Sequence, residues 1–250
     1  PGGQTGDNID DSYGYPYLLK SKSSKDVMTA IWVDIAKKYK DEPVIVGYDL
    51  INEPVAHYFQ DEIDVLNNEL LSLYKQTVSA IRMVDKKHTI FLNGSIWSGN
   101  FDVFKEMIED NIVYEFHKYW FEVNQGAVQN YVDFSNQHQV PIYLGESGEN
   151  TDEWVHDFRS LLDANNINWC FWPYKKMNNT KGIMTFDEPE DYQLISDYSL
   201  SDRSSYNKIR ANKPDQAKVQ KALNIFLKNA LYKNNYPNKG YINALNFKLN

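Results

Sequence analysis

The sequence predicts an α/β fold built on a parallel sheet, of the type found in (β/α)8 barrels. Apolar runs that suit strands alternate with stretches of helical periodicity along most of the 250 residues. Polar side chains directly follow four of these strands, at the carboxyl ends where a (β/α)8 barrel places its chemistry. No Gly-rich phosphate-binding motif follows any strand, which disfavours a doubly wound nucleotide-binding sheet.

The first helix and the first strand lie between residues 25 and 51. Apolar residues fall at helical spacing over residues 25–39, and Pro43 closes this region. Residues 44–51 predict a strand that is apolar on both faces, as in a parallel strand covered by helices. We therefore expect the run Val44-Ile45-Val46 to be buried.

The alternation of strands and helices continues to the end of the chain. We predict further strands at residues 89–93, 112–119, 141–145 and 168–174, and helices at 62–84, 102–109, 127–138, 150–164 and 214–232. Asn150 with Glu153 indicates a capping box at the start of the fourth of these helices. We see no repeat or linker, so we expect one domain over residues 1–250. Five strands cannot close a barrel and would leave two open edges.

Composition narrows the class of partner. The net charge of −8 argues against nucleic acid and anionic membranes, both of which attract clustered Lys and Arg. No apolar run reaches the roughly 18 residues of a membrane span, and we recognise no signal peptide. The chain has 18 Tyr and 6 Trp, and aromatic rings offer flat platforms for sugars. The single cysteine, Cys170, allows no internal disulfide, and we expect it to be buried as a small apolar residue.

Two carboxylates are the leading catalytic candidates. Glu53 ends the first strand in Asn52-Glu53-Pro54, and Glu146 ends the fourth, after Gly145. In a parallel barrel both side chains would face the same mouth. Paired carboxylates perform glycoside hydrolysis, one as acid and the other as nucleophile about 5–5.5 Å away in retaining enzymes. The alternative is two solvated loop glutamates.

The third strand carries His117 and Tyr119, two residues apart and hence on one face. A Tyr hydroxyl can bond a nucleophilic carboxylate and keep it ionised. His117 would bond either the substrate or the acid/base. The alternative for His117 is a purely structural role.

Aromatic residues near the strand ends are candidate sugar platforms. Trp172 lies nearer the end of the last predicted strand than Trp169, which we expect to pack in the core. Trp97, Trp120 and Tyr15 are further candidates. No His or Cys spacing suggests zinc. The acidic residues at 187–191 could bind a cation, but we expect them to be solvated, so we predict no metal and no cofactor.

Together these motifs resemble the cellulase family of retaining glycosidases, glycoside hydrolase family 5. The motifs are, in order, Asn52-Glu53-Pro54 after an apolar strand, His117-x-Tyr119, Gly145-Glu146-x-Gly148 and Trp172 on the last strand. The opening Pro1-Gly2-Gly3-Gln4 resembles the loop after the third barrel strand of that family, and residues 241–245 resemble its C-terminal segment. Any one motif is weak, whereas the ordered set is specific.

The resemblance implies a role for each residue. Glu53 would be the general acid/base, and Asn52 beside it would bind the sugar 2-hydroxyl. Glu146 would be the nucleophile, with Tyr119 hydrogen-bonded to it. His117 would line the catalytic subsite, and Trp172 would be the platform under the sugar. It also implies that this chain holds strands 4 to 8 of the barrel. Three strands, with an Arg and a His, would then come from an N-terminal segment or a second chain. The family further implies a secreted, cell-surface or periplasmic location.

Two classes of function follow. The first is a retaining endo-β-glucanase acting on β-1,4-linked glucan, with β-mannan, xyloglucan and β-1,3-glucan open as alternatives because loops set that choice. The second is a non-catalytic carbohydrate-binding barrel remnant. Glu53, Glu146 and Tyr119 together favour the enzyme, since pure binding does not need them.

Overall fold

The computed structural model describes residues 15–248, which form two compact units. The first contains residues 15–147 and 160–170, and the second contains residues 148–159 and 171–248. The single domain expected over residues 1–250 stays a prediction. The motif at Pro1–Gln4 lies outside the described residues.

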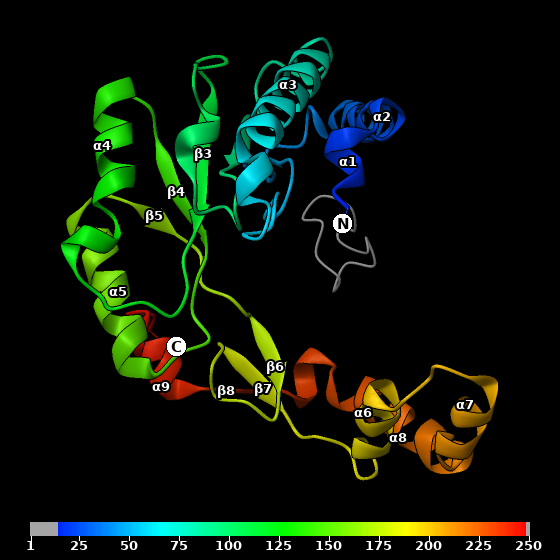
Figure 1. The fold of residues 1–250 in the computed structure, drawn as a ribbon. Coiled ribbons are helices and arrows are strands. Elements are labelled where there is room, and N and C mark those ends of the chain that lie inside the picture. Colours follow the sequence, from blue (N-terminus) through cyan, green and yellow to red (C-terminus); the bar gives the residue numbers. More distant parts are fainter. Residues whose placement is uncertain (1–14, 249–250) are drawn as a thin grey trace. The chain divides into compact units, whose positions relative to one another are not determined.

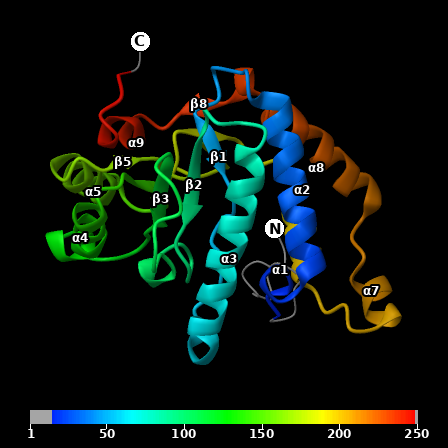
Figure 2. The same ribbon diagram turned by 90° about the horizontal axis from the view of Figure 1, so that it is seen from above.

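A parallel five-stranded sheet in the order β1-β2-β3-β4-β5 is the centre of the first unit (Figure 1 and Figure 2). Its strands are β1 (Gly47–Asp49), β2 (Thr89–Asn93), β3 (Ile112–His117), β4 (Ile142–Glu146) and β5 (Asn168–Trp169). Every neighbouring pair is parallel. The predicted parallel α/β arrangement with five strands is therefore confirmed, although β1 and β5 are shorter than expected.

Helices precede or connect the strands of this unit. They are α1 (Tyr17–Lys20), α2 (Lys22–Tyr39), α3 (Ile63–Arg82), α4 (Gln129–His138) and α5 (Asp152–Ala164), which has residues in both units, with short 3-10 turns at Gln60–Glu62, Phe101–Val103 and Gln125–Ala127. The Ser21 side chain caps α2 by accepting a hydrogen bond from the Ser24 backbone N–H. Helices α2 and α3 lie side by side (Figure 2).

The core of the first unit lies between the sheet and α3. Buried side chains recur on one face of this helix, at Leu66, Leu70, Leu73, Tyr74, Val78 and Ile81. Burying each large aliphatic side chain contributes about 1.5–3 kcal/mol. The Tyr74 hydroxyl donates to the backbone oxygen of Asn93 at 2.7 Å, which ties α3 to the carboxyl end of β2.

The helix predicted at residues 102–109 is wrong. Only the 3-10 turn Phe101–Val103 forms, opened by the Asn100 side chain, which accepts from the Asp102 backbone N–H at 2.8 Å. Phe104 is buried, with its ring 4.7 Å from that of Tyr114. The apolar residues that suggested a helix are instead held by aromatic contacts.

Two predictions of burial near the ends of the sheet are also wrong. Val44 and Val46 are 84 % and 77 % exposed, because β1 begins only at Gly47 and Val46 lines an open concave pocket. Cys170 is exposed as well and lines the same pocket. This pocket has a volume of about 580 Å³ and is walled mainly by apolar residues with two carboxylates, Asp49 and Glu115.

The second unit contains a small sheet that the sequence did not predict. Strands β6 (Lys175–Met177) and β7 (Met184–Phe186) are parallel, and β8 (Tyr236–Pro237) is antiparallel to β7. The helices are α6 (Gln193–Leu200), α7 (Tyr206–Asn212), α8 (Gln216–Asn229) and α9 (Lys239–Ala244), with a 3-10 turn at Tyr232–Asn234. At the start of α5, Thr151 rather than Asn150 accepts from the Trp154 backbone N–H.

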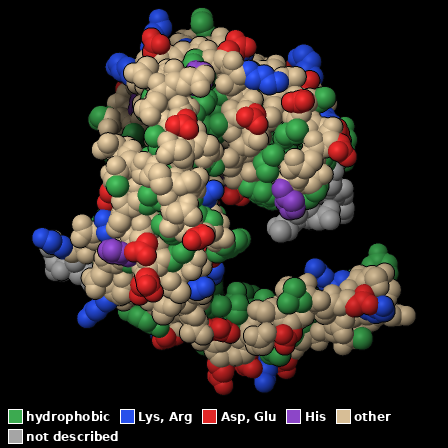
Figure 3. All heavy atoms as spheres, turned by 60° about the vertical axis from the view of Figure 1, so that its left-hand side comes forward, with side chains coloured by type: hydrophobic (Ala, Val, Ile, Leu, Met, Phe, Trp, Pro, Cys, Tyr) green, Lys and Arg blue, Asp and Glu red, His purple; other side chains and the backbone are tan. Residues whose placement is uncertain are grey.

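Charged side chains of both signs are mixed on the surface (Figure 3). On the face that Figure 3 shows, Lys and Arg side chains are interspersed with Asp and Glu and form no continuous basic patch. In the loop at residues 187–191, Glu190 pairs with Lys221 and Asp191 pairs with Lys218. Within the described part of the chain, no helix is both long and apolar enough to span a membrane.

Candidate active site

The loop after β1 presents Glu53 in an unusual backbone conformation. Glu53 and Val55 have φ angles of 48° and 66°, the left-handed region that L side chains rarely adopt. The Val55 carbonyl accepts a hydrogen bond from the Trp97 backbone N–H at 3.1 Å. The Glu53 N–H points to Asn93 Oδ1 at 3.5 Å. These contacts hold the kinked loop against the chain that follows β2.

Strand β3 supplies His117 opposite Glu146 of β4. The β3–β4 register shifts by one residue between Phe116 and His117, so that His117 is paired with Glu146. After this bulge the Lys118 backbone N–H donates to the Glu146 carbonyl at 3.2 Å. The irregularity therefore places the imidazole and the carboxylate side by side at the carboxyl ends of the strands.

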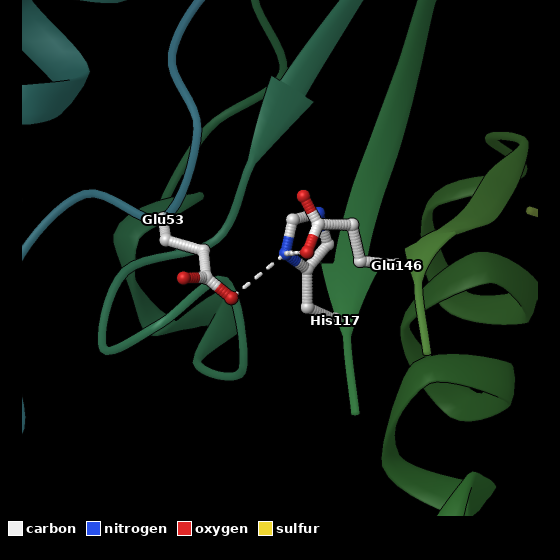
Figure 4. Close-up of side chains that lie close together, drawn as sticks. All are labelled: Glu53, His117 and Glu146. Carbon is white, nitrogen blue, oxygen red and sulfur yellow. Dashed lines mark hydrogen bonds and ion pairs between the residues drawn. The ribbon is translucent and has the colours of Figure 1, made fainter. Parts of the chain in front are cut away.

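Glu53, His117 and Glu146 converge from three different segments (Figure 4). His117 Nδ1 lies 3.0 Å from Glu53 Oε1 and 3.9 Å from Glu146 Oε2. One oxygen of each carboxylate and one ring nitrogen of His117 all lie within 4.8 Å of one another. The Tyr119 hydroxyl donates to Glu146 Oε2 at 3.0 Å, as expected from the sequence. The first unit thus brings together four of the predicted site residues.

The charges around His117 favour its protonated form. Its side chain is only 2 % exposed, and burial alone would lower its pKa. Hydrogen bonds to Glu115 and Glu53 and the charge of Glu146 reverse this effect and raise the pKa of His117 to about 9. Burial raises the pKa of Glu146, although His117 and the Tyr119 hydroxyl oppose that rise.

The same residues bear on whether the site suits a metal ion. Glu53, His117 and Glu146 offer three ligand atoms close enough for one cation. A pKa of about 9 keeps a hydrogen on both ring nitrogens of His117 at neutral pH, and an imidazolium has no lone pair for a metal. A cation held by these three residues would have to displace the Nδ1 hydrogen of His117.

Asp49 has the partner that the sequence did not reveal. Asn93, fully buried at the end of β2, donates its Nδ2 hydrogen to Asp49 Oδ1 at 2.9 Å and accepts from the Ser98 hydroxyl at 2.5 Å. Surrounding protein atoms desolvate the Asp49 carboxyl group, and together with the nearby charge of Glu115 they raise its pKa to about 7.

The other predicted site residues are not among the side chains that converge on His117. Asn52 is exposed beside Glu53. Trp172 is 52 % exposed and belongs to the second unit, so its role as a platform stays a prediction. Trp97 donates from Nε1 to His57 Nδ1 at 3.0 Å, and Trp120 is 71 % exposed.

Glu115, like Asn93, is a residue of the site that the sequence did not predict. Its carboxylate accepts from His117 Nε2 at 3.1 Å, and the residue is 4 % exposed. Glu115 precedes His117 by two positions, so the alternation that paired His117 with Tyr119 also places Glu115 on the same face.

Comparison with known proteins decides the family. Residues 10–178 match the family described as Cellulase (glycosyl hydrolase family 5). The chain belongs to this family. The chain is 28 % identical over 201 residues to a beta-xylosidase of Phanerodontia chrysosporium. It is 24 % identical over 196 residues to an endoglucanase of Paenibacillus polymyxa.

The chain spans less than half the length of these two relatives. The matched region covers 79 % of this chain but 39 % of the beta-xylosidase, and 63 % of this chain but 49 % of the Paenibacillus endoglucanase. Among solved structures, the endoglucanase Cel5A of Thermotoga maritima superposes with a TM-score of 0.54 at 19 % identity, covering 67 % of this chain and 69 % of that one. The same enzyme in complex with mannotriose gives a TM-score of 0.53 at 20 % identity, covering 63 % and 62 %. The five-stranded sheet is consistent with part of a family 5 barrel.

Proposed function

We propose that this chain carries the catalytic site of a retaining endo-β-glucanase, which hydrolyses β-1,4-linked glucan by double displacement. The observation that carries the proposal is the approach of a Glu53 oxygen to within 4.8 Å of a Glu146 oxygen. Retaining glycosidases hold their two carboxyl groups about 5–5.5 Å apart, whereas inverting enzymes need about 6.5–9.5 Å for an intervening water.

Glu146 is the better nucleophile. Tyr119 and His117 both favour its ionised form, and its backbone belongs to β4. It would attack the anomeric carbon and form a glycosyl-enzyme ester. Glu53, beside His117, would protonate the leaving oxygen and then deprotonate the water that cleaves the ester. Asn52 would bind the sugar 2-hydroxyl, and Trp172 would stack under the ring.

We also propose that the five strands are strands 4 to 8 of a barrel that an N-terminal segment or a second chain completes. Among the described residues, β1 pairs only with β2 and β5 only with β4, so both edges are open. The concave pocket beside them is largely apolar. If the chain alone binds no environment-sensitive apolar dye and stays monomeric, this face is covered in some other way and the proposal fails.

The proposal of β-1,4-glucan as substrate is supported by the substrates named for similar proteins. The endoglucanases favour glucan, and the mannotriose complex keeps β-mannan as the first alternative, with xyloglucan and β-1,3-glucan after it. The open sheet edges favour a second class of function, a non-catalytic carbohydrate-binding remnant. For polymeric substrates of this kind we propose action outside the cytoplasm, which fractionation of the source cells would test.

The decisive experiment compares the chain with its Glu146→Gln variant on soluble β-1,4-glucan, mannan, xyloglucan and β-1,3-glucan. We expect the variant to lose about 10³-fold or more in rate while still binding glycan. Glu106→Gln, the same Glu-to-Gln change on the surface, is the control, because Glu106 forms a surface ion pair with Lys75. Products with inverted anomeric configuration would contradict the retaining assignment. An inactive chain that still binds glycan would favour the remnant.

A further inference from the structure

Glu115 is a buried carboxylate for which the proposed hydrolysis has no role. Its side chain is 5 % exposed, and its Oε1 accepts the Nε2–H of His117 at 3.1 Å. A buried carboxylate is strongly destabilising unless it is paired and hydrogen-bonded. The fold therefore retains Glu115 in a position where His117 offsets that cost.

Strand β4 leaves space for this carboxylate. A Cβ atom at Gly145 would lie 1.6 Å from Glu115 Oε1 and 2.4 Å from its Cδ. No side chain other than glycine fits there unless Glu115 moves. Two neighbouring strands thus cooperate to hold one carboxylate against one imidazole.

The groups that face His117 come from several elements and are mostly acidic. Glu53 approaches from the loop after β1, Asp49 from β1 and Glu146 from β4. Glu115 lies on β3, the strand of His117 itself. Glu115 is also near three neutral titratable groups, Tyr74, Tyr143 and Cys170. Because Glu115 holds Nε2–H, the second ring nitrogen, Nδ1, faces Glu53 at 3.0 Å.

We propose that Glu115 is a positioning residue that acts through His117 to keep the catalytic proton available to Glu53. The inference rests on the proposed function. Nδ1 of His117 and Oε1 of Glu53 share one proton, and Glu115 holds the ring orientation and supplies the negative charge that retains this proton on the pair. In the first step the shared proton moves from His117 Nδ1 to Glu53 Oε1 and on to the leaving oxygen, so the Nδ1–H bond breaks and the O–H bond of the leaving group forms. In the second step Glu53 takes a proton from the attacking water and shares it again with His117 Nδ1, so the pair is restored.

The Glu115→Gln variant tests the charge separately from the orientation. Its amide oxygen still accepts the Nε2–H, but the negative charge is lost. The proton on the Glu53–His117 pair is then released more easily as pH rises. We expect the basic limb of kcat/KM on the best soluble glucan to move to lower pH by about one unit or more, with the acid limb unchanged. Glu115→Ala, which also frees the ring, should lower kcat by about 10–100-fold with little change in KM.

Two matched variants locate the effect. Asp49→Asn removes a carboxylate from the same pocket that makes no hydrogen bond to His117, so it should move the basic limb less than Glu115→Gln does. Glu106→Gln on the surface should leave the limb in place. An unmoved limb in Glu115→Gln, or an equal shift in Asp49→Asn, would overturn the inference.

A spectroscopic titration separates this inference from the proposed function. The protein is labelled with ¹⁵N-histidine, and the His117 signals are assigned by comparison with His117→Gln. These signals should report a pKa well above that of an ordinary histidine, and this pKa should fall in Glu115→Gln. If Glu115→Gln folds poorly, Glu115→Asp serves instead. It keeps the negative charge, so most of the rise in the His117 pKa should remain in this variant. A chain that hydrolyses no glycan but shows this titration refutes the proposed function alone. A glycan-hydrolysing chain whose His117 titration ignores Glu115 refutes the positioning role.

Discussion

Asp85 gives a stability prediction that is independent of catalysis. Its side chain is 1 % exposed and accepts hydrogen bonds from the Tyr48 hydroxyl at 2.7 Å and the Lys87 N–H at 2.9 Å, and from the backbone and ring of His88. Burial alone would raise the pKa of Asp85, but these hydrogen bonds lower it to about 2. The folded state therefore holds this proton less tightly than the unfolded chain does.

The sign and size of the effect follow from this difference. Because the folded pKa is depressed, the stabilisation is complete above the unfolded pKa of 3.8 and is lost as pH falls towards about 2. At about 1.4 kcal/mol for each pH unit, the gap between 3.8 and about 2 corresponds to about 2–3 kcal/mol.

Urea unfolding between about pH 5 and pH 2 measures this contribution. As pH falls over this range, the free energy of unfolding of the wild type should decrease by about 2–3 kcal/mol more than that of Asp85→Asn, because the Asn amide does not titrate. Asp34→Asn, an exposed change on α2, is the control and should follow the wild type. If the free-energy difference between the wild type and Asp85→Asn is the same at every pH, the hydrogen-bonded cluster does not act as described.

Three further predictions concern the sheet and the site. Tyr119→Phe removes a hydrogen bond that favours ionised Glu146, so the acid limb of kcat/KM should move up by about one pH unit; an unmoved limb would contradict the nucleophile assignment. Gly145→Ala pushes a methyl group into Glu115, so it should reproduce the lowered basic limb of Glu115→Gln, and a wild-type profile would refute the steric argument. Phe116→Ala empties a fully buried site and should lower the free energy of unfolding by about 3–5 kcal/mol; a loss below 1 kcal/mol would show that the site collapses freely.

Much of the fold follows from sequence periodicity. The strand at Thr89–Asn93 forms at the predicted residues, and the helices at residues 22–39 and 216–229 form close to them. Periodicity failed where tertiary contacts decide. The stretch around Phe104 has helical spacing, but its aromatic contacts stabilise a non-helical conformation. Strands β6 to β8 are too short to show a strand pattern in the sequence.

The site was predictable where chemistry concentrates at strand ends. Glu53, His117 and Glu146 meet as expected, because parallel strands bring their carboxyl ends to one edge. Glu115 and Asn93 were missed because a buried polar side chain shows no signal until its partner is known. The bulge at Phe116 is equally invisible in the sequence, although it sets His117 opposite Glu146.

The two carboxylates differ in how firmly the backbone holds them. Glu146 sits in a strand, bonded through its carbonyl to Lys118, whereas Glu53 sits in a left-handed turn whose own N–H reaches a partner only at 3.5 Å. The separation of the two carboxyl groups therefore depends on a strand residue, Glu146, and on a loop residue, Glu53. Substitutions in residues 51–55 should tune the carboxylate separation, and with it the choice between ester formation and direct attack by water, while leaving the sheet intact. The loop is thus the place to alter stereochemical outcome by engineering.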